Sequence, residues 1–139
     1  MLSRLTASAL RESGATFRLP WAAGPSVSAD CLVSATETYF ARFRDMPGAT
    51  VAALRLRRAF RSMPGAIGVS LAMRPLQRRS WSISAWETEA DLRRFLHSAA
   101  HRATIRRYRP HVTVRSDAWR VDRFDLSEAI REAETRFSR

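Results

Sequence analysis

The stretch Ser84-Ala-Trp-Glu-Thr-Glu-Ala-Asp-Leu-Arg-Arg-Phe-Leu-His-Ser-Ala-Ala-His101 joins a predicted strand to a predicted helix and decides the fold class. Residues 80–86 alternate in the way of a strand and end at Trp86. Thr88 is a typical N-cap residue, and acidic side chains follow in the first helical turn, where the helix dipole favours them. Apolar residues then recur at helical spacing. A single helix is therefore predicted over residues 89–107, before Pro110.

Working outward from this junction, turn residues divide the rest of the chain into short elements. The predicted elements are a strand over 30–40, a helix over 49–62, a hairpin of strands 66–74 and 80–86, the helix over 89–107, a strand from 111 toward 121 and a helix over 127–137. This β-α-β-β-α-β order with a C-terminal helix is typical of a ferredoxin-like α+β domain, with both crossover helices on one sheet face. We assign the domain to residues 30–139.

Residues 1–29 form an N-terminal extension that we expect to be partly disordered. They are rich in Arg, Ser and Ala, a composition shared by transit peptides and by disordered extensions. No run of apolar residues in the 139-residue chain is long enough for a membrane span, and no secretory core segment precedes the domain. The single Cys31 cannot form an internal disulfide. We therefore expect a cytoplasmic protein.

All 24 basic side chains are Arg and none is Lys, against 13 acidic residues, which gives a formal net charge of +11. Arginine binds phosphate and carboxylate bidentately, so this charge can serve an anionic partner such as nucleic acid. Codon usage in a GC-rich genome explains the total absence of Lys equally directly, and the even scatter of Arg agrees with it. Both interpretations stay open.

The predicted hairpin has two unlike faces, because successive strand residues point to opposite sides. We expect a bulky face and a face of small residues with Trp86 at its edge. The bulky face combines Ile67, Val69, Leu71 and Met73 with Trp81, Ile83 and Ala85, and the other combines Gly68, Ser70 and Ala72 with Ser80, Ser82, Ser84 and Trp86. The small residues indicate close backbone packing or a ligand cavity, or else the hairpin has a different register from the one assumed here. A sheet covered on one face only would also expose apolar surface, so we expect a homodimer built through sheet faces.

Three features of the chain resemble the dimeric α/β-barrel superfamily, in particular small antibiotic-biosynthesis-monooxygenase-like and spheroidene-monooxygenase-like proteins. They are the element order, the string Ser84-Ala-Trp-Glu-Thr-Glu, and the later Phe95, Leu96 and Ser98-Ala-Ala-His101. The resemblance spans residues 31 to about 121. It implies a homodimeric barrel whose subunits each bind an aromatic, polyketide-like or haem-type ligand between sheet and helices. Members include cofactor-independent oxygenases and haem-binding enzymes, so the cofactor expected is either none or haem.

The resemblance also suggests site residues. His101 matches the haem-ligating His of the haem-degrading branch, which carries a Trp where this chain has Phe95 and a first-strand Asn that this chain lacks. We predict His101 as the catalytic residue, acting as proton acceptor or haem ligand. The predicted ligand-binding residues are Trp86, Ser82, Ser84, Ser70, Phe95 and His97. The alternatives are that both histidines are surface or interface residues and that Trp86 is plain core. An unbroken helix directs the histidines to solvent or to the partner subunit, and a kink near Ser98 would change that direction.

Two functional classes follow. The first is a small dimeric monooxygenase-like oxidoreductase that acts on an aromatic or polyketide-like compound. The second is a non-catalytic basic module that binds an anionic partner such as nucleic acid. Only the charge supports this class. The sequence has neither an aromatic stacking pair in a basic, glycine-containing context nor a recognition helix. No set of metal ligands is expected, because His97 and His101 lack Cys or clustered carboxylate partners.

Overall fold

The structure is a computed structural model that describes residues 15–138. Its main elements are β1 (Phe17–Arg18), β2 (Ala22–Ala23), β3 (Cys31–Phe40), α2 (Met46–Ala59), β4 (Ala66–Arg74), β5 (Arg79–Trp86), α3 (Glu89–Leu96), α4 (Ala99–Tyr108), β6 (Val112–Val121) and α5 (Leu126–Phe137). Short 3-10 turns lie at Phe43–Asp45, Phe60–Ser62, Pro75–Gln77 and Arg109–His111.

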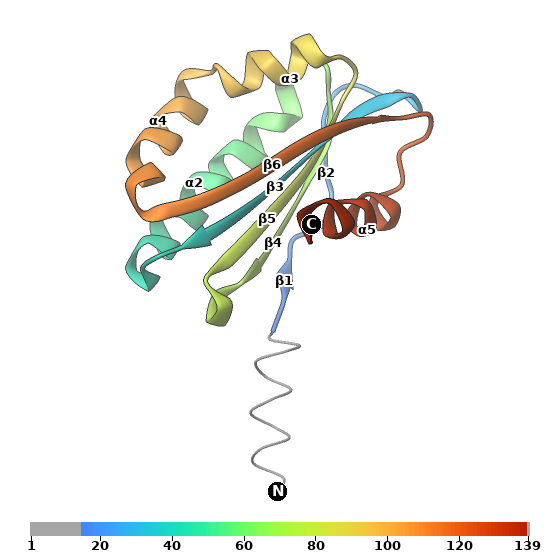
Figure 1. The fold of residues 1–139 in the computed structure, drawn as a ribbon. Coiled ribbons are helices and arrows are strands. Elements are labelled where there is room, and N and C mark those ends of the chain that lie inside the picture. The colour runs from blue at the N-terminus through green and yellow to red at the C-terminus, as the bar shows by residue number, and fades with distance from the viewer. Residues whose placement is uncertain (1–14, 139) are drawn as a thin grey trace, which may run out of the picture.

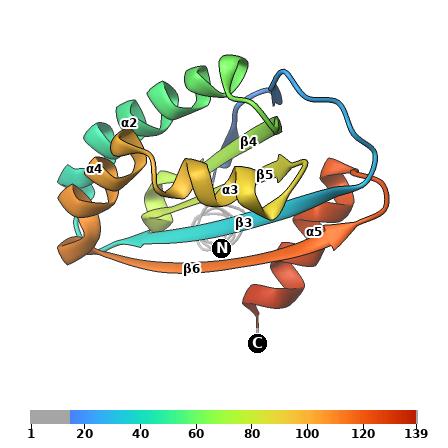
Figure 2. The same ribbon diagram turned by 90° about the horizontal axis from the view of Figure 1, so that it is seen from above.

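The strands form one antiparallel sheet in the order β6-β3-β5-β4, and β1 and β2 both pair with the outer edge of β4. Helices α2, α3 and α4 lie over one face of this sheet (Figures 1 and 2). The predicted ferredoxin-like α+β arrangement is thereby confirmed. Two segments of the predicted N-terminal extension, β1 and β2, belong to the sheet, and residues 1–14 lie outside the described part of the chain.

Helix α2 begins three residues before the predicted start, at Met46. Pro47 occupies its first turn, where a missing backbone N–H leaves no intrahelical hydrogen bond unmade. The Met-Pro-Gly sequence at 46–48 therefore opens the helix, whereas the similar sequence at 63–65 follows its end. Gly65 there adopts a φ of +81°, which is accessible to glycine at little cost.

The predicted continuous helix over 89–107 is wrong, because the chain breaks into α3 and α4 at His97 and Ser98. Thr88 caps α3 as expected, with its side chain accepting a hydrogen bond from the Asp91 N–H at 3.1 Å. Ser98 is extended (φ −64°, ψ 150°) and caps α4 in the same way through the His101 N–H. A serine that accepts such a bond competes with helix continuation. The break changes the direction in which the residues after it project.

The expected combination of hairpin faces is also wrong. The tight turn after Arg74, with Arg78 in the left-handed region, pairs Arg74 with Arg79 and so places Val69 opposite Ser84 and Leu71 opposite Ser82. The bulky residues of β4 thus share a face with the serines of β5. A β-bulge between Ala66 and Gly68 further separates Ile67 from them, onto the opposite face. A turn one residue longer or shorter would have reversed which faces of the two strands combine.

The second face of the sheet is covered in part by α5, which corrects the expectation of an open face within the subunit (Figures 1 and 2). Ala129, Ala133 and Phe137 of α5 pack on a buried cluster of small and branched residues. This cluster comprises Cys31, Val33, Ala35, Ile83 and Ala85. The C-terminal helix was predicted at the right place in the sequence, but its own apolar stripe supplies the layer that we had assigned to a second subunit.

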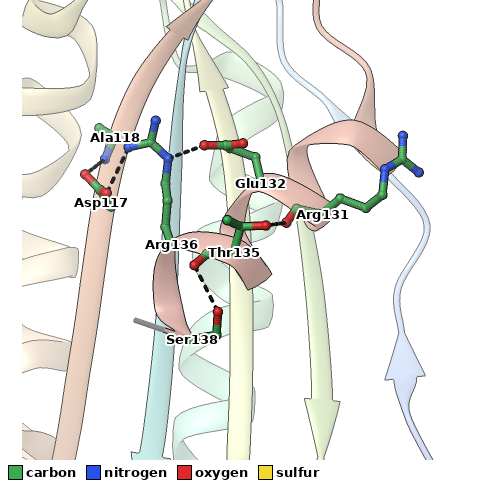
Figure 3. A network of polar contacts seen from close by, with 7 residues as sticks. All are labelled: Asp117, Ala118, Arg131, Glu132, Thr135, Arg136 and Ser138. Carbon is green, nitrogen blue, oxygen red and sulfur yellow. Dashed lines mark hydrogen bonds and ion pairs between the residues drawn. The ribbon is translucent and has the colours of Figure 1, made fainter.

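Polar contacts tie α5 to the outer strand β6 (Figure 3). Arg136 donates to Asp117 of β6 at 2.9 Å and to Glu132 of its own helix at 2.8 Å. Its guanidinium also lies 4.5 Å from the Trp119 ring centroid. The hydrogen bond from Arg136, with a second one from the Ala118 N–H, lowers the pKa of Asp117. These contacts fix the helix against one edge of the sheet.

Candidate ligand-binding cavity

A cavity of about 720 Å³ lies between the sheet and helices α2, α3 and α4. Its walls are mainly apolar side chains from the helices and from β4. They include Ala53, Leu54, Leu56, Phe60, Leu92, Phe95, Leu96, Ile105, Tyr108, Val69, Leu71 and Met73. A space of this size and lining is typical of sites for small organic ligands. A cavity therefore lies between the sheet and the helices, where the sequence predicted a ligand site.

The floor of the cavity is a double row of hydroxyl groups, which distinguishes it from an ordinary apolar core. Strand register sets three pairs side by side on β3 and β5: Ser34 with Ser84, Thr36 with Ser82, and Thr38 with Ser80. Thr36 shares a hydrogen bond with Ser116 of β6 at 3.1 Å, and Ser84 accepts one from the Trp86 indole at 2.9 Å. Within residues 15–138, the other four hydroxyls have no hydrogen-bond partner.

His101 lines the cavity from the first turn of α4. Its ring packs against Phe95, with 4.8 Å between ring centroids. Burial lowers the pKa of His101, and a hydrogen bond to the Leu96 backbone opposes this only in part. The imidazole is therefore neutral at pH 7, where it can accept a proton. The break at Ser98 produces this placement, because on a continuous helix the ring would project away from the apolar stripe.

Arg57 is a lining residue that the sequence analysis missed. One of its terminal nitrogens donates to the Pro20 carbonyl at 2.7 Å, but its Nε is buried and has no hydrogen-bond partner within residues 15–138. A buried donor without a partner is costly, so this atom is available to an acceptor on a bound ligand. Arginines surround the predicted helix almost evenly in sequence, and no pattern singles this one out.

Trp86 lies behind the cavity wall and does not line it. It is fully buried, with ring centroids 5.1 Å from Phe60 and 5.3 Å from Phe95. Its indole N–H is satisfied by Ser84. Trp86 therefore supports two residues that do line the cavity, and its own exposed surface is nil.

The structure brings together Ser82, Ser84, Phe95 and His101 at the cavity, while Ser70 and His97 lie elsewhere. Ser70 faces α5 and accepts a hydrogen bond from Arg18 at 3.0 Å. His97 is exposed at the end of α3. On the face that carries Ser70, the Trp21 side chain fills the space beside Gly68, so close packing and not a void accounts for the glycine.

Among residues 15–138 there is no group of three or more side chains placed to hold a metal ion. No helix in the described part of the chain has the length and apolar character needed to cross a membrane. The chemistry that the cavity itself offers is thus shape, hydroxyl groups, one buried guanidinium nitrogen and one neutral imidazole.

Comparison with known proteins agrees with this geometry. The sequence profile of the antibiotic biosynthesis monooxygenase family matches residues 41–107, which run from the turn before α2 to the end of α4. No curated protein sequence matches the chain significantly.

Several solved structures share the fold at low sequence identity. Protein SO0527 from Shewanella oneidensis has a TM-score of 0.56 at 13% identity, over 66% of this chain and 91% of that one. SnoaB, a cofactor-independent oxygenase from Streptomyces nogalater, has a TM-score of 0.51 at 16% identity, over 71% and 98%. Rv0793 from Mycobacterium tuberculosis has a TM-score of 0.54 at 10% identity, over 68% and 96%. The chain is therefore similar to the antibiotic biosynthesis monooxygenase family over residues 41–107, and it shares the ferredoxin-like fold of these solved structures.

Proposed function

We propose that this monooxygenase-like protein binds a planar aromatic, polyketide-like compound in the cavity and oxidises it with dioxygen, with His101 as the proton acceptor. The observation that carries the proposal is the combination of an apolar wall, a floor of paired hydroxyls and a neutral imidazole in one cavity. Apolar walls suit fused rings, and the hydroxyls suit a row of ring oxygens along one edge of the ligand.

The chemistry requires nothing beyond substrate and dioxygen. A substrate with an acidic ring methylene loses a proton to His101 and becomes an electron-rich carbanion. This carbanion transfers its electrons to dioxygen. One oxygen atom bonds to the ring carbon, which becomes a carbonyl, and the other leaves as water with the two hydrogens of the methylene. Arg57 Nε and the floor hydroxyls stabilise the negative charge on the ring oxygens.

Haem is the second candidate ligand, and among the described residues His101 fits the role of its iron ligand. His101 is the one imidazole on the cavity wall, and its hydrogen bond to the Leu96 backbone is of the kind that orients metal-ligating histidines. Bound haem would supply redox chemistry and dioxygen binding. His101 would hold the iron, and Arg57 would lie on the wall as a cation for a propionate. An absorption spectrum with added haem, compared between the wild type and His101→Ala, distinguishes this ligand from a cofactor-free site.

The homodimer also remains part of the proposal, but through a different surface. Since α5 covers part of the second sheet face, the surface that favours self-association is the outer edge of β6. This ten-residue strand pairs with no other strand on that side among residues 15–138. Sedimentation at micromolar concentration should give about 32 kDa, twice the 15.8 kDa of one chain. Cytoplasmic localisation stays a prediction from the sequence.

The direct test is dioxygen uptake with a hydroxylated anthrone as substrate. His101→Ala should lower the rate by about 10²- to 10⁴-fold, the usual contribution of a general base. His97→Ala is the matched control, because it removes an exposed imidazole four residues away and should leave the rate unchanged. Equal rates in the wild type and His101→Ala, or no uptake and no binding of the anthrone by the wild type, would contradict the proposal.

The pH dependence of that rate gives a second readout. The pKa of His101 is lowered by burial, so the neutral base persists to lower pH than an exposed histidine would allow. The rate should fall on acidification with a midpoint below about 6.5, the ordinary histidine value. A midpoint at or above that value would assign the proton transfer to another group.

A further inference from the structure

We propose that the chain has a second ligand site, an anion-binding pocket of about 350 Å³ between the C-terminal end of α5 and the second face of the sheet. Its ligand is a small organic anion that carries a phosphate or carboxylate group. The pocket lies across the sheet from the hydroxyl-lined cavity and does not depend on the function proposed for that cavity.

The pocket is built by cross-strand register on the part of the sheet that lies beside the C-terminal end of α5. One row across the strands runs Arg18, Ala72, Trp81, Glu37 and Arg115. The next row on the same face begins with the pair Arg74 and Arg79. Four guanidinium groups from four strands therefore gather around one tryptophan.

The charges in the pocket are unequal. Four arginines line it, against two carboxylates, Glu37 on β3 and Glu134 on α5. Glu37 is already engaged, because one of its oxygens accepts the Trp81 indole N–H at 2.8 Å. Within residues 15–138 neither Arg79 nor Arg115 has an ion-pair partner. The described residues thus compensate only part of the positive charge of the pocket.

Several of these arginines are held in place by neighbours. Arg18 donates to the buried Ser70 hydroxyl at 3.0 Å, and the Arg74 guanidinium lies 5.8 Å from the Trp81 ring centroid. Arg115 lies 5.4 Å from the ring centroid of Phe137 on α5. Side chains that are already ordered lose less entropy on binding, so a bound anion would gain more of the interaction energy.

The shape of the pocket favours a small ligand over a macromolecule. The arginines line a recess roofed by Ile130, Phe137 and Ser138 of α5, and a duplex cannot enter a space of this volume. Guanidinium groups bind phosphate and carboxylate with the same bidentate geometry, so both groups belong to the proposed class.

Titration calorimetry at low salt tests the site with two probes, inorganic pyrophosphate and benzene-dicarboxylate. Arg79→Gln and Arg115→Gln should each weaken binding by about tenfold or more, the usual effect of removing a charge-assisted hydrogen bond. Both side chains are exposed, so the variants should fold. Arg102→Gln is the matched control, because it removes the same charge from exposed α4 and should leave the dissociation constant unchanged.

Saturable binding of either probe with this pattern supports the site, and the tighter probe identifies the recognised group. Absence of saturable binding of both probes would overturn the proposal. Equal weakening in Arg102→Gln would also overturn it, since the effect would then come from net charge alone. A short DNA duplex that competes with pyrophosphate at one site would likewise overturn it, in favour of a nucleic-acid surface.

Discussion

The two faces of the sheet are made by the same strands, yet one is filled where α5 packs on it, beside the smaller anion pocket, and the other is hollow. On the α5 side, Val33 and Ala85 are fully buried in a cluster closed by the helix. On the other side, their immediate neighbours in sequence, such as Ser34 and Ser84, form the floor of a cavity of about 720 Å³. A period of two residues is enough to separate a stabilising core from a binding surface.

This difference indicates where each kind of substitution should act. Small and branched residues under α5 contribute packing, and their replacement should lower stability without a specific effect on ligands. Hydroxyls and His101 on the cavity side contribute recognition, and their replacement should lower ligand binding at little cost to stability. Trp86 is the exception, because it lies on the cavity side but is packed as core.

The largest effect is expected from a charge placed in the filled face. Val33→Asp should lower the free energy of unfolding by about 3–5 kcal/mol, because the carboxylate would be buried without a partner. Urea denaturation measures the loss. Val51→Asp on exposed α2 is the control and should change the free energy by less than about 0.5 kcal/mol. Similar losses in both variants would remove the distinction between a filled face and a solvated surface.

Trp86→Ala tests the residue that belongs to both regions. The loss of a fully buried ring should cost about 3–5 kcal/mol of stability, measured by thermal or chemical unfolding. Trp86→Phe keeps most of the packing and removes only the indole donor to Ser84, so it should cost distinctly less. A Trp86→Ala protein of unchanged stability but weakened aromatic binding would show that Trp86 meets the ligand directly.

Ser82→Ala and Ser70→Ala sharpen the comparison, since the two serines lie on neighbouring strands but on opposite faces. Ser82→Ala should weaken binding of a hydroxylated aromatic by about 0.5–1.5 kcal/mol, which is roughly 2- to 12-fold in Kd. Ser70→Ala should leave this affinity unchanged. Fluorescence titration measures both. Equal effects would mean that the ligand does not lie on the hydroxyl floor.

The smallest effect concerns the attachment of α5 through Asp117 and Arg136. The pKa of Asp117 is lower in the folded chain, so its stabilising contribution is present above the unfolded value of about 3.9 and is lost as the pH falls through the folded value. Asp117→Asn should lower Tm slightly at pH 7 and flatten the fall in Tm below pH 4, so that the Tm values of the two proteins converge in acid. An identical acid profile in the wild type and Asp117→Asn would show that the contact contributes nothing.

Local sequence signals predicted most elements of the fold. Thr88 marked the start of α3, the alternation over 66–74 and 80–86 marked the hairpin, and the stripe over 127–137 marked α5. Each signal lies within a few residues, where propensity and capping act. The single helix across His97 and Ser98 was wrong because a serine inside an apolar periodicity does not by itself decide between a continuous helix and a capped break.

The sequence by itself determined the order of the elements, the family resemblance and the position of His101 within a helical segment, because these depend on neighbours along the chain. Tertiary structure decided which faces combine and what each one does. The turn at Pro75–Gln77 set the register that put Val69 beside Ser84, the break at Ser98 placed His101 on the cavity, and α5 took the face expected for a partner. The turn and the cap are local, but which side chains they bring together depends on contacts between residues far apart in sequence, where a shift of one residue moves a side chain to the opposite face.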